Sequence, residues 1–220
     1  MDSISNNKSD FINNIIVQKA NWDVYLSEFK NEFDLKLKSI KNNIIKAIGN
    51  LVENFNELKN ITFNPEIIDS DSAAIEIATK SNIVFLLTLF ETNLHIIQKR
   101  MINTNPKLIF NYNNPKIVDF NYFIVINNNI VLNQEQKDLW NKINNVYRPI
   151  RNAIVHNFSN ISSLKNEKQI VLDFINKHSD LIHIQNDNIW FETNFVKKIT
   201  NDIYLYLDFL FDAIIKQNNE

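Results

Sequence analysis

The sequence contains no cysteine in its 220 residues, and it has only 1 glycine and 4 prolines. Without cysteine there is no disulfide framework, zinc–thiolate site or thiol nucleophile. β-Sandwiches and doubly wound α/β folds rely on glycine at turns, bulges and phosphate-binding loops, so a single glycine argues against both. The composition therefore predicts an all-α fold, a bundle of helices.

Long apolar runs and a strong excess of one charge are missing too. The most apolar stretch, IVFLLTLF at 83–90, is too short to span a bilayer, and the N-terminal MDSISNNKSD has no apolar signal core. We therefore expect a cytoplasmic protein without a membrane partner. A formal net charge of −2 argues against a broad nucleic-acid-binding face, so any such contact is expected to be confined to a small basic patch.

A hydrophobic content of 45% is enough for a packed core, and the sequence shows no repeat and no linker. We expect one domain over residues 1–220, with an N-terminal helical region at 1–70 and a core at 71–220.

Apolar residues recur at helical spacing in four regions. Helices are predicted from about Phe11 to Leu58, from Asp71 or Ser72 to about Ile102, from Asn133 onward, and from about Asn194 to Lys216. Asn133 and Gln136 resemble a capping box. In the first helix, Trp22 and Tyr25 belong to one series of apolar residues at this spacing. The last is expected to bury Phe195, Ile199, Ile203, Tyr206, Leu210 and Phe211.

Two regions favour strands. The sequence YFIVI at 122–126 and NIVL at 129–132 indicate short strands in an irregular segment, and DLIHIQNDNIWFE at 180–192 indicates a hairpin that turns at QNDN. The predicted fold is thus a helical bundle with long helices and a small β-hairpin near its C-terminus.

The stretch YRPIRNAIVHN at 147–157 concentrates polar groups on a helix, and Pro149 should kink or restart that helix. At about 100° per residue, Arg148, Asn152 and His156 follow one another in a single line. Arg151 flanks the line, about 140° from His156. The apolar positions that cluster on the other side and are expected to face the core are Ile150, Ala153, Ile154 and Phe158, and Val155 is the only apolar residue inside the polar arc.

This spacing has two consequences. Asn152 is expected to orient His156 by a hydrogen bond. Arg151 and His156 reach one substrate only if it lies across the helix face, and an antiparallel second copy of the helix would bring one subunit's arginine near the other's histidine. We therefore expect a homodimer with a cleft between two such helices.

These residue types suit phosphodiester cleavage without a metal or cofactor. A histidine with an ordinary pKa of about 6.5 exchanges protons with a ribose hydroxyl or a leaving oxygen, and a guanidinium clamps the phosphate. RNA is the expected substrate because its 2′-hydroxyl is an internal nucleophile. The same spacing is also typical of an ordinary solvated helix face.

A second polar stripe, which includes Glu91 and His95, interrupts the apolar helix after residue 83. It is either a hydrogen-bonded seam inside the bundle or an auxiliary part of the site. A third metal ligand at recognisable spacing is lacking, so no metal is predicted.

Arg148 is the best second phosphate ligand, although a surface salt bridge explains it equally well. His178 and His183 are expected to be ordinary surface residues.

RNAIVH at 151–156 resembles the signature of the HEPN superfamily, in which arginine, a polar residue and a few further residues precede a histidine. SNIVFLLTLFET, which includes Glu91, and DLIHIQNDNIWFETNFVKKI resemble the central helix and the hairpin–helix order of the MAE-type branch. The resemblance covers roughly residues 75 to 217; residues 1 to 70 match only as helix.

The resemblance implies a metal-independent endoribonuclease that acts as a homodimer, as a toxin in toxin–antitoxin, abortive-infection or other anti-phage systems. Arg151 and His156 would be catalytic, Asn152 would assist, and Glu91 would line the site. Phe158 stands where toxins paired with a nucleotidyltransferase antitoxin often carry tyrosine, which puts that regulation in doubt. The alternatives are a HEPN module that only binds nucleotide or RNA, and a helical protein-interaction domain.

Overall fold

The computed structural model describes residues 9–25, 27–28, 31 and 66–219. Of the helix expected from Phe11 to Leu58, residues 9–25 are helical, and most of the rest lies outside the described residues.

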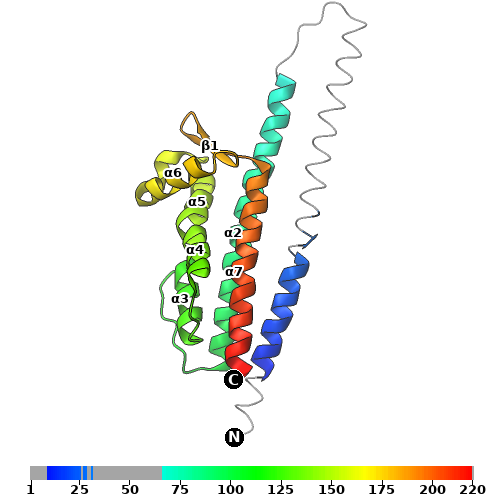
Figure 1. Ribbon diagram of the computed structural model, residues 1–220, viewed down its shortest axis with the longest axis vertical. Coiled ribbons are helices and arrows are strands. Elements are labelled where there is room, and N and C mark those ends of the chain that lie inside the picture. Colours follow the sequence, from blue (N-terminus) through cyan, green and yellow to red (C-terminus); the bar gives the residue numbers. More distant parts are fainter. Residues whose placement is uncertain (1–8, 26, 29–30, 32–65, 220) are drawn as a thin grey trace, which may run out of the picture.

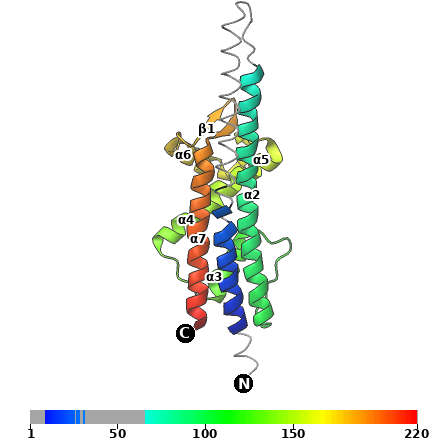
Figure 2. The same cartoon turned by 90° about the vertical axis from the view of Figure 1, so that its right-hand side faces the viewer.

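The described residues are mainly helical, as predicted, and include one small hairpin. Three long helices, the one at residues 9–25, α2 and α7, lie side by side (Figure 1), and Figure 2 shows the first of them between the other two. A second column of shorter helices covers the opposite side. The elements in order are α2 (Glu66–Thr104), α3 (Ile117–Asn127), α4 (Gln134–Lys142), the π-helical turn η1 (Ile143–Tyr147), α5 (Arg148–Asn157), the 3₁₀ segment η2 (Ile161–Glu167), α6 (Lys168–Lys177), β1 (Ile182–Gln185), β2 (Asn188–Phe191) and α7 (Thr193–Asn219).

Helix α7 forms the centre of the core. Every residue predicted to be buried along it is fully buried, because these positions recur at the helical period and form one apolar stripe. The Tyr206 hydroxyl donates to Asn121 Oδ1 at 2.8 Å, which ties α7 to α3. None of the described helices combines the length and apolarity needed to cross a bilayer.

Polar contacts hold the N-terminal helix against α2 and α7. Gln18 donates to Asn93 Oδ1 of α2 at 3.0 Å, and Lys19 lies 2.7 Å from Asp208 and 2.5 Å from Asp212 of α7. Of the apolar series in this helix, Trp22 is buried and Tyr25 is exposed.

The C-terminal hairpin is confirmed, with Gln185 paired to Asn188 across a two-residue loop. Asn186 and Asp187 both have positive φ, at 51° and 61°, as a type I′ turn requires. The capping box of Asn133 and Gln136 is also present, at 2.9 and 2.8 Å.

The strand predictions at 122–126 and 129–132 are wrong. The first lies inside α3, whose buried residues Ile117, Phe120 and Ile124 recur at i, i+3 and i+7, which is helical spacing, and the second has no regular structure. Helix α2 begins at Glu66, ahead of the predicted caps at Asp71 and Ser72.

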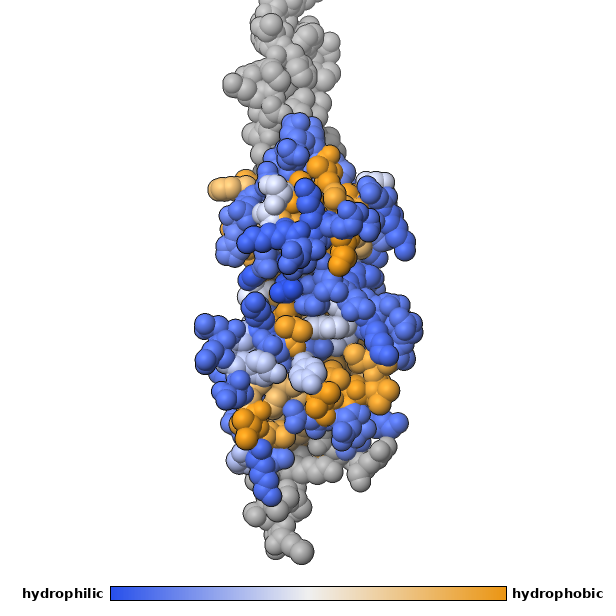
Figure 3. Space-filling model, turned by 90° about the vertical axis from the view of Figure 1, so that its left-hand side faces the viewer, coloured by the Kyte–Doolittle hydropathy of each residue, from blue (hydrophilic) through white to orange (hydrophobic). Residues whose placement is uncertain are grey.

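Apolar side chains gather on the face that Figure 3 shows, over its lower half, where α3 and its flanking loops lie. The exposed apolar residues of these segments are Ile109, Tyr112, Val118, Tyr122, Ile126 and Val131.

His178, which follows the last residue of α6, makes stability depend on pH. It is partly buried rather than a simple surface residue, with its ring 4.5 Å from the ring of Phe174. Burial, together with Lys198 and Lys177, lowers the pKa of its imidazole. Below about pH 6.5 the unfolded chain therefore binds a proton at His178 more readily than the folded chain does. The free energy of unfolding of the wild type should fall as the pH drops through that value.

Thermal unfolding of wild type and His178→Gln between pH 5 and pH 8 measures this effect. We expect the wild type to lose stability relative to the variant below about pH 6.5. Parallel stability profiles across the whole range would contradict the prediction.

Candidate functional site

The π-helical turn η1 carries the chain into the motif. The Arg148 backbone N–H donates to Ile143 O, five residues earlier, which widens the helix by one residue. Pro149 follows at once; it has no N–H to donate, and in a regular α-helix its ring would clash with the carbonyl four residues before it. The predicted interruption before the motif is therefore a π-turn, after which α5 continues to Asn157.

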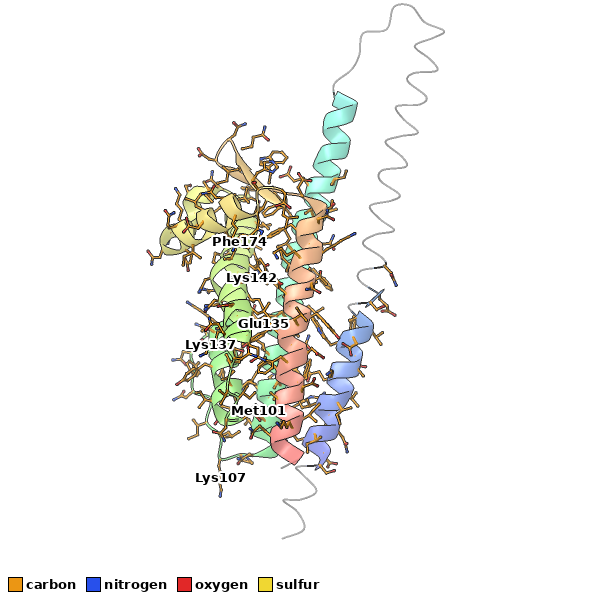
Figure 4. All side chains as sticks on the ribbon, viewed as in Figure 1. Met101, Lys107, Glu135, Lys137, Lys142 and Phe174 are labelled. Carbon is orange, nitrogen blue, oxygen red and sulfur yellow. The ribbon has the colours of Figure 1, made fainter. Side chains whose placement is uncertain are left out.

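A buried polar network holds this turn against α7. The Tyr147 hydroxyl donates to Asp202 Oδ2 at 2.5 Å, and Lys142 Nζ lies 3.0 Å from the same oxygen. Tyr147 is fully buried between the rings of Phe174 and Phe195, and burial raises the pKa of its hydroxyl far above the usual range, which keeps it protonated as a donor. Figure 4 shows Lys142 and Phe174 in the region between α4 and α6 on one side and α7 on the other. Arg148 follows Tyr147 directly, so the network sets where α5 begins.

The burial predicted from the helical wheel holds for the residues inside α5 and fails for the residue after its end. Ile150 and Ala153 are buried and Ile154 is partly buried, as predicted, whereas Phe158 is 90% exposed. Its predicted place in the core is wrong because α5 ends at Asn157 and Phe158 adopts the left-handed conformation, with φ 50° and ψ 35°.

Asn152 contacts the arginine of the motif and not the histidine. The Arg151 guanidinium donates to Asn152 Oδ1 at 3.0 Å, whereas the exposed imidazole of His156 has no hydrogen-bond partner among the described residues. Asn152 thus orients Arg151 within one chain, contrary to the expectation that it would orient His156.

Arg148 turns toward the segment after α5. Its Nε donates to Asn144 O at 3.1 Å, and its Nη2 lies 3.9 Å from Glu167 Oε1 of η2. Such a long, partly exposed ion pair contributes little to stability, so Glu167 keeps most of its capacity to accept hydrogen bonds.

A pocket of about 250 Å³ opens between α5 and η2. Asn152 and His156, two of the site residues predicted from the sequence, line this pocket. Residues of η2, which were not predicted, line it as well. Arg151, Arg148, Glu91 and His95 are not among its walls. The lining residues are Pro149, Asn152, Ala153, His156, Asn157, Ser163, Leu164, Lys165 and Glu167.

The η2 residues that line the pocket belong to no recognisable sequence motif. The turn at Asn160, which begins η2, brings them beside α5. Asn160 caps η2 by accepting from the Ser162 N–H at 2.9 Å, and the Ser163 hydroxyl donates to Asn160 O at 2.7 Å. These bonds turn the chain back along α5. The cluster NISS at 160–163 is a turn signal, but only tertiary packing shows which helix face it covers.

Glu91 and His95, expected as auxiliary residues of the site, do not line the pocket between α5 and η2. His95 stacks on Phe120 of α3 at 5.0 Å, so it belongs to the packing of α2 against α3. Glu91, one turn away on α2, is partly exposed. Within the part of the chain that the structure describes, no group of three or more His, Asp or Glu side chains is placed to hold a metal ion.

Lys165, on the pocket wall, has a strained backbone with φ 38° and ψ −117°. A residue with a Cβ adopts such a conformation at a cost of about 1–3 kcal/mol, and glycine adopts it freely. Lys165→Gly should therefore raise the free energy of unfolding by about 1 kcal/mol after the extra entropy of glycine in the unfolded chain is subtracted.

Urea denaturation measures the change, with Lys168→Gly as the matched control, because Lys168 begins the regular helix α6 and glycine there should destabilise by about 0.5–1 kcal/mol. A Lys165→Gly variant less stable than wild type would show that the strain is not relieved.

Comparison of the chain with protein-family models, with curated proteins and with solved structures finds no significant match.

Proposed function

We propose that the protein is a metal-independent endoribonuclease of HEPN type that cleaves RNA in a cleft formed by two copies of α5. The observation that carries the proposal is that Arg151 and His156 lie on different sides of this helix. Arg151 is held by Asn152 on one flank, and His156 lines the pocket on the other. Because the two are about 140° apart around the axis and about 7.5 Å apart along it, one helix does not place both on a single phosphate.

The exposed surface of α5 supports a helix–helix contact. Val155, 47% exposed, lies between the arginine flank and the histidine flank, and Phe158 projects beyond the end of the helix. A second α5 packed antiparallel across Val155 would cover both apolar side chains and bring each Arg151 near the partner's histidine.

In this arrangement each reacting centre uses His156 from one subunit and Arg151 from the other. The imidazole takes the proton of the ribose 2′-hydroxyl while its oxygen attacks phosphorus. The bond from phosphorus to the 5′-oxygen breaks, and that oxygen takes up a proton from water. The guanidinium neutralises the extra negative charge on the phosphate oxygens. The products are a 2′,3′-cyclic phosphate and a 5′-hydroxyl.

Uncontrolled RNA cleavage harms the cell that makes the enzyme, so we further propose a toxin or effector role in anti-phage defence, restrained by a cognate partner. Expression of wild type should slow growth, and Arg151→Ala should restore it.

The direct test is incubation of the purified protein with RNA in EDTA. Cleavage that leaves cyclic phosphate ends, and that Arg151→Ala or Arg151→Lys removes, supports the proposal, since lysine keeps the charge but loses the bidentate contact. RNA that is bound but never cleaved would favour the rival function, a HEPN module that only binds. The pocket beside α5 serves such a module equally well.

A further inference from the structure

Three lysines and a histidine gather where the end of α6 meets the first turns of α7. The rings of Phe174 and Phe195 lie 6.1 Å apart, which packs the last turn of α6 on the first turn of α7. His178 and Lys198 each follow one of these phenylalanines by about one helical turn, so both lie beside the same contact. The lysine cluster consists of Lys142 of α4, Lys177 and His178 at the end of α6, and Lys198 of α7.

Electrostatics shows that these side chains lie close together. Burial lowers the pKa of the His178 imidazole, and the charges of Lys198 and Lys177 lower it further. Lys142 acts in the same direction, and Asp180 acts against it. Because salt screens exposed charges beyond about 10 Å at 0.1 M ionic strength, lysines that act on one imidazole lie near it and near one another. The field at this ring is therefore set by positive charges from three helices.

Two of the three ammonium groups lack an acidic partner. Lys142 forms an ion pair with Asp202 at 3.0 Å, so its charge is largely offset. Within the described ranges of the chain, Lys177 and Lys198 form no ion pair, not even with Asp180. Lys177 is exposed and Lys198 is half-buried. The cluster thus presents two unpaired positive charges beside an imidazole that can take up a third.

A phosphate group fits this cluster. Like charges held together repel one another, and an anion bound between them removes that repulsion. Lysine binds phosphate as a point charge, and contacts between lysine and backbone phosphates supply most of the sequence-independent affinity for nucleic acids. With a net charge of −2 the protein offers no broad basic face, so a phosphate contact has to come from a local cluster of this kind.

The cluster is separate from the proposed site of cleavage. Lys142 precedes Arg151 by about two and a half helical turns, or roughly 13 Å along the axis. A phosphate held by the cluster is therefore not the one that is attacked. We propose, on the basis of the proposed RNA cleavage, that the lysine cluster binds a backbone phosphate of the RNA substrate at a distance from the cleaved bond.

The test measures binding without cleavage. The probe is a 2′-O-methyl RNA oligonucleotide, whose blocked 2′-oxygen prevents the attack on phosphorus, and its affinity is measured at several salt concentrations. Lys177→Gln combined with Lys198→Gln should weaken binding roughly tenfold and lower the slope of log K against log salt by about 0.7, the value for one lost phosphate contact on a single strand. Lys142 is left in place, because its removal would disturb the pair with Asp202.

The matched control removes the same number of charges elsewhere. Lys107 and Lys137 are both exposed; Lys107 lies near the lower end of the molecule and Lys137 on the outer side of α4 (Figure 4). Their combined substitution by glutamine should change the affinity less than twofold and leave the salt slope at the wild-type value.

The imidazole of His178 provides a second readout, which does not depend on the affinity. A bound phosphate favours the protonated ring, so the oligonucleotide should raise the pKa of His178 in the wild type, measured by NMR titration. In the variant without Lys177 and Lys198 the oligonucleotide should change that pKa much less. A loss of affinity equal to that of the control, a pKa of His178 that does not respond to the oligonucleotide, or no binding at all would overturn the inference.

Failure of this inference is distinguishable from failure of the proposed function. Cleavage of ordinary RNA by the wild type, together with unchanged affinity of the cluster variant, would remove the role of the cluster and keep the nuclease. Binding that depends on Lys177 and Lys198, without cleavage of ordinary RNA, would remove the nuclease and keep the phosphate site.

Discussion

Alanine at position 156 should lower the rate of RNA cleavage by about 10²–10⁴-fold, the usual contribution of a positioned general base. The His156 side chain is exposed and makes no hydrogen bond within the described part of its chain, so its removal should leave folding unchanged. The effect should appear in kcat, because in the proposed mechanism the imidazole acts on the 2′-hydroxyl in the transition state.

His183→Ala is the matched control, since this histidine lies on β1, outside the pocket, and pairs with Trp190 across the hairpin. It should cleave at the wild-type rate. Circular dichroism and thermal unfolding of both variants check that their folds are retained. If His156→Ala cleaved within a few-fold of wild type, the histidine would belong to a solvated helix face and not to a catalytic site.

Removal of the carboxylate at Asp202 should cost about 3 kcal/mol of unfolding free energy. Asp202 is buried and accepts from two groups at once, the Tyr147 hydroxyl and Lys142. In Asp202→Ala the buried hydroxyl of Tyr147 is left without an acceptor, which costs about 1–3 kcal/mol, and the attraction to the partly exposed Lys142 is also lost. At this chain length the loss corresponds to roughly 6–12 °C in Tm.

Asp212→Ala on the same helix provides the comparison. That carboxylate pairs with Lys19 at the surface and should contribute under about 1 kcal/mol. Asp202→Asn keeps an oxygen that accepts from the tyrosine and should lose about half as much as alanine. Equal losses for Asp202→Ala and Asp212→Ala in chemical denaturation would mean that the network does not anchor the π-turn.

The sequence predicted those parts of the fold that depend on local periodicity and turn chemistry. The apolar stripe of α7, the Asn133 cap and the hairpin turn at Asn186 and Asp187 each follow from residues close in sequence, and the structure confirms them. The strand predicted at 122–126 failed because an apolar run rich in β-branched residues reads as strand over five residues, and only its longer context reveals the helical period of α3.

The candidate site was predictable in part, for a similar reason. Arg151, Asn152 and His156 lie on one helix, so their angular relation follows from helix geometry alone. Lys165 and Glu167 were missed because η2 returns along α5 through the turn at Asn160, and nothing in the local sequence specifies which helix face that turn covers. The partner of Asn152 was misassigned because the neighbouring arginine side chain folds across the helix surface to reach it.

The central claim, that one subunit's Arg151 acts with the other's His156, is tested most directly by mixing two inactive variants. Arg151→Ala and His156→Ala are combined in equal amounts, unfolded and refolded together, and assayed for RNA cleavage in EDTA. Half of the dimers are then mixed, and each has one centre with both residues intact, so roughly a quarter of the wild-type activity should return. A mixture as inactive as its two components, with mixed dimers demonstrated by differential tagging, would contradict the composite site.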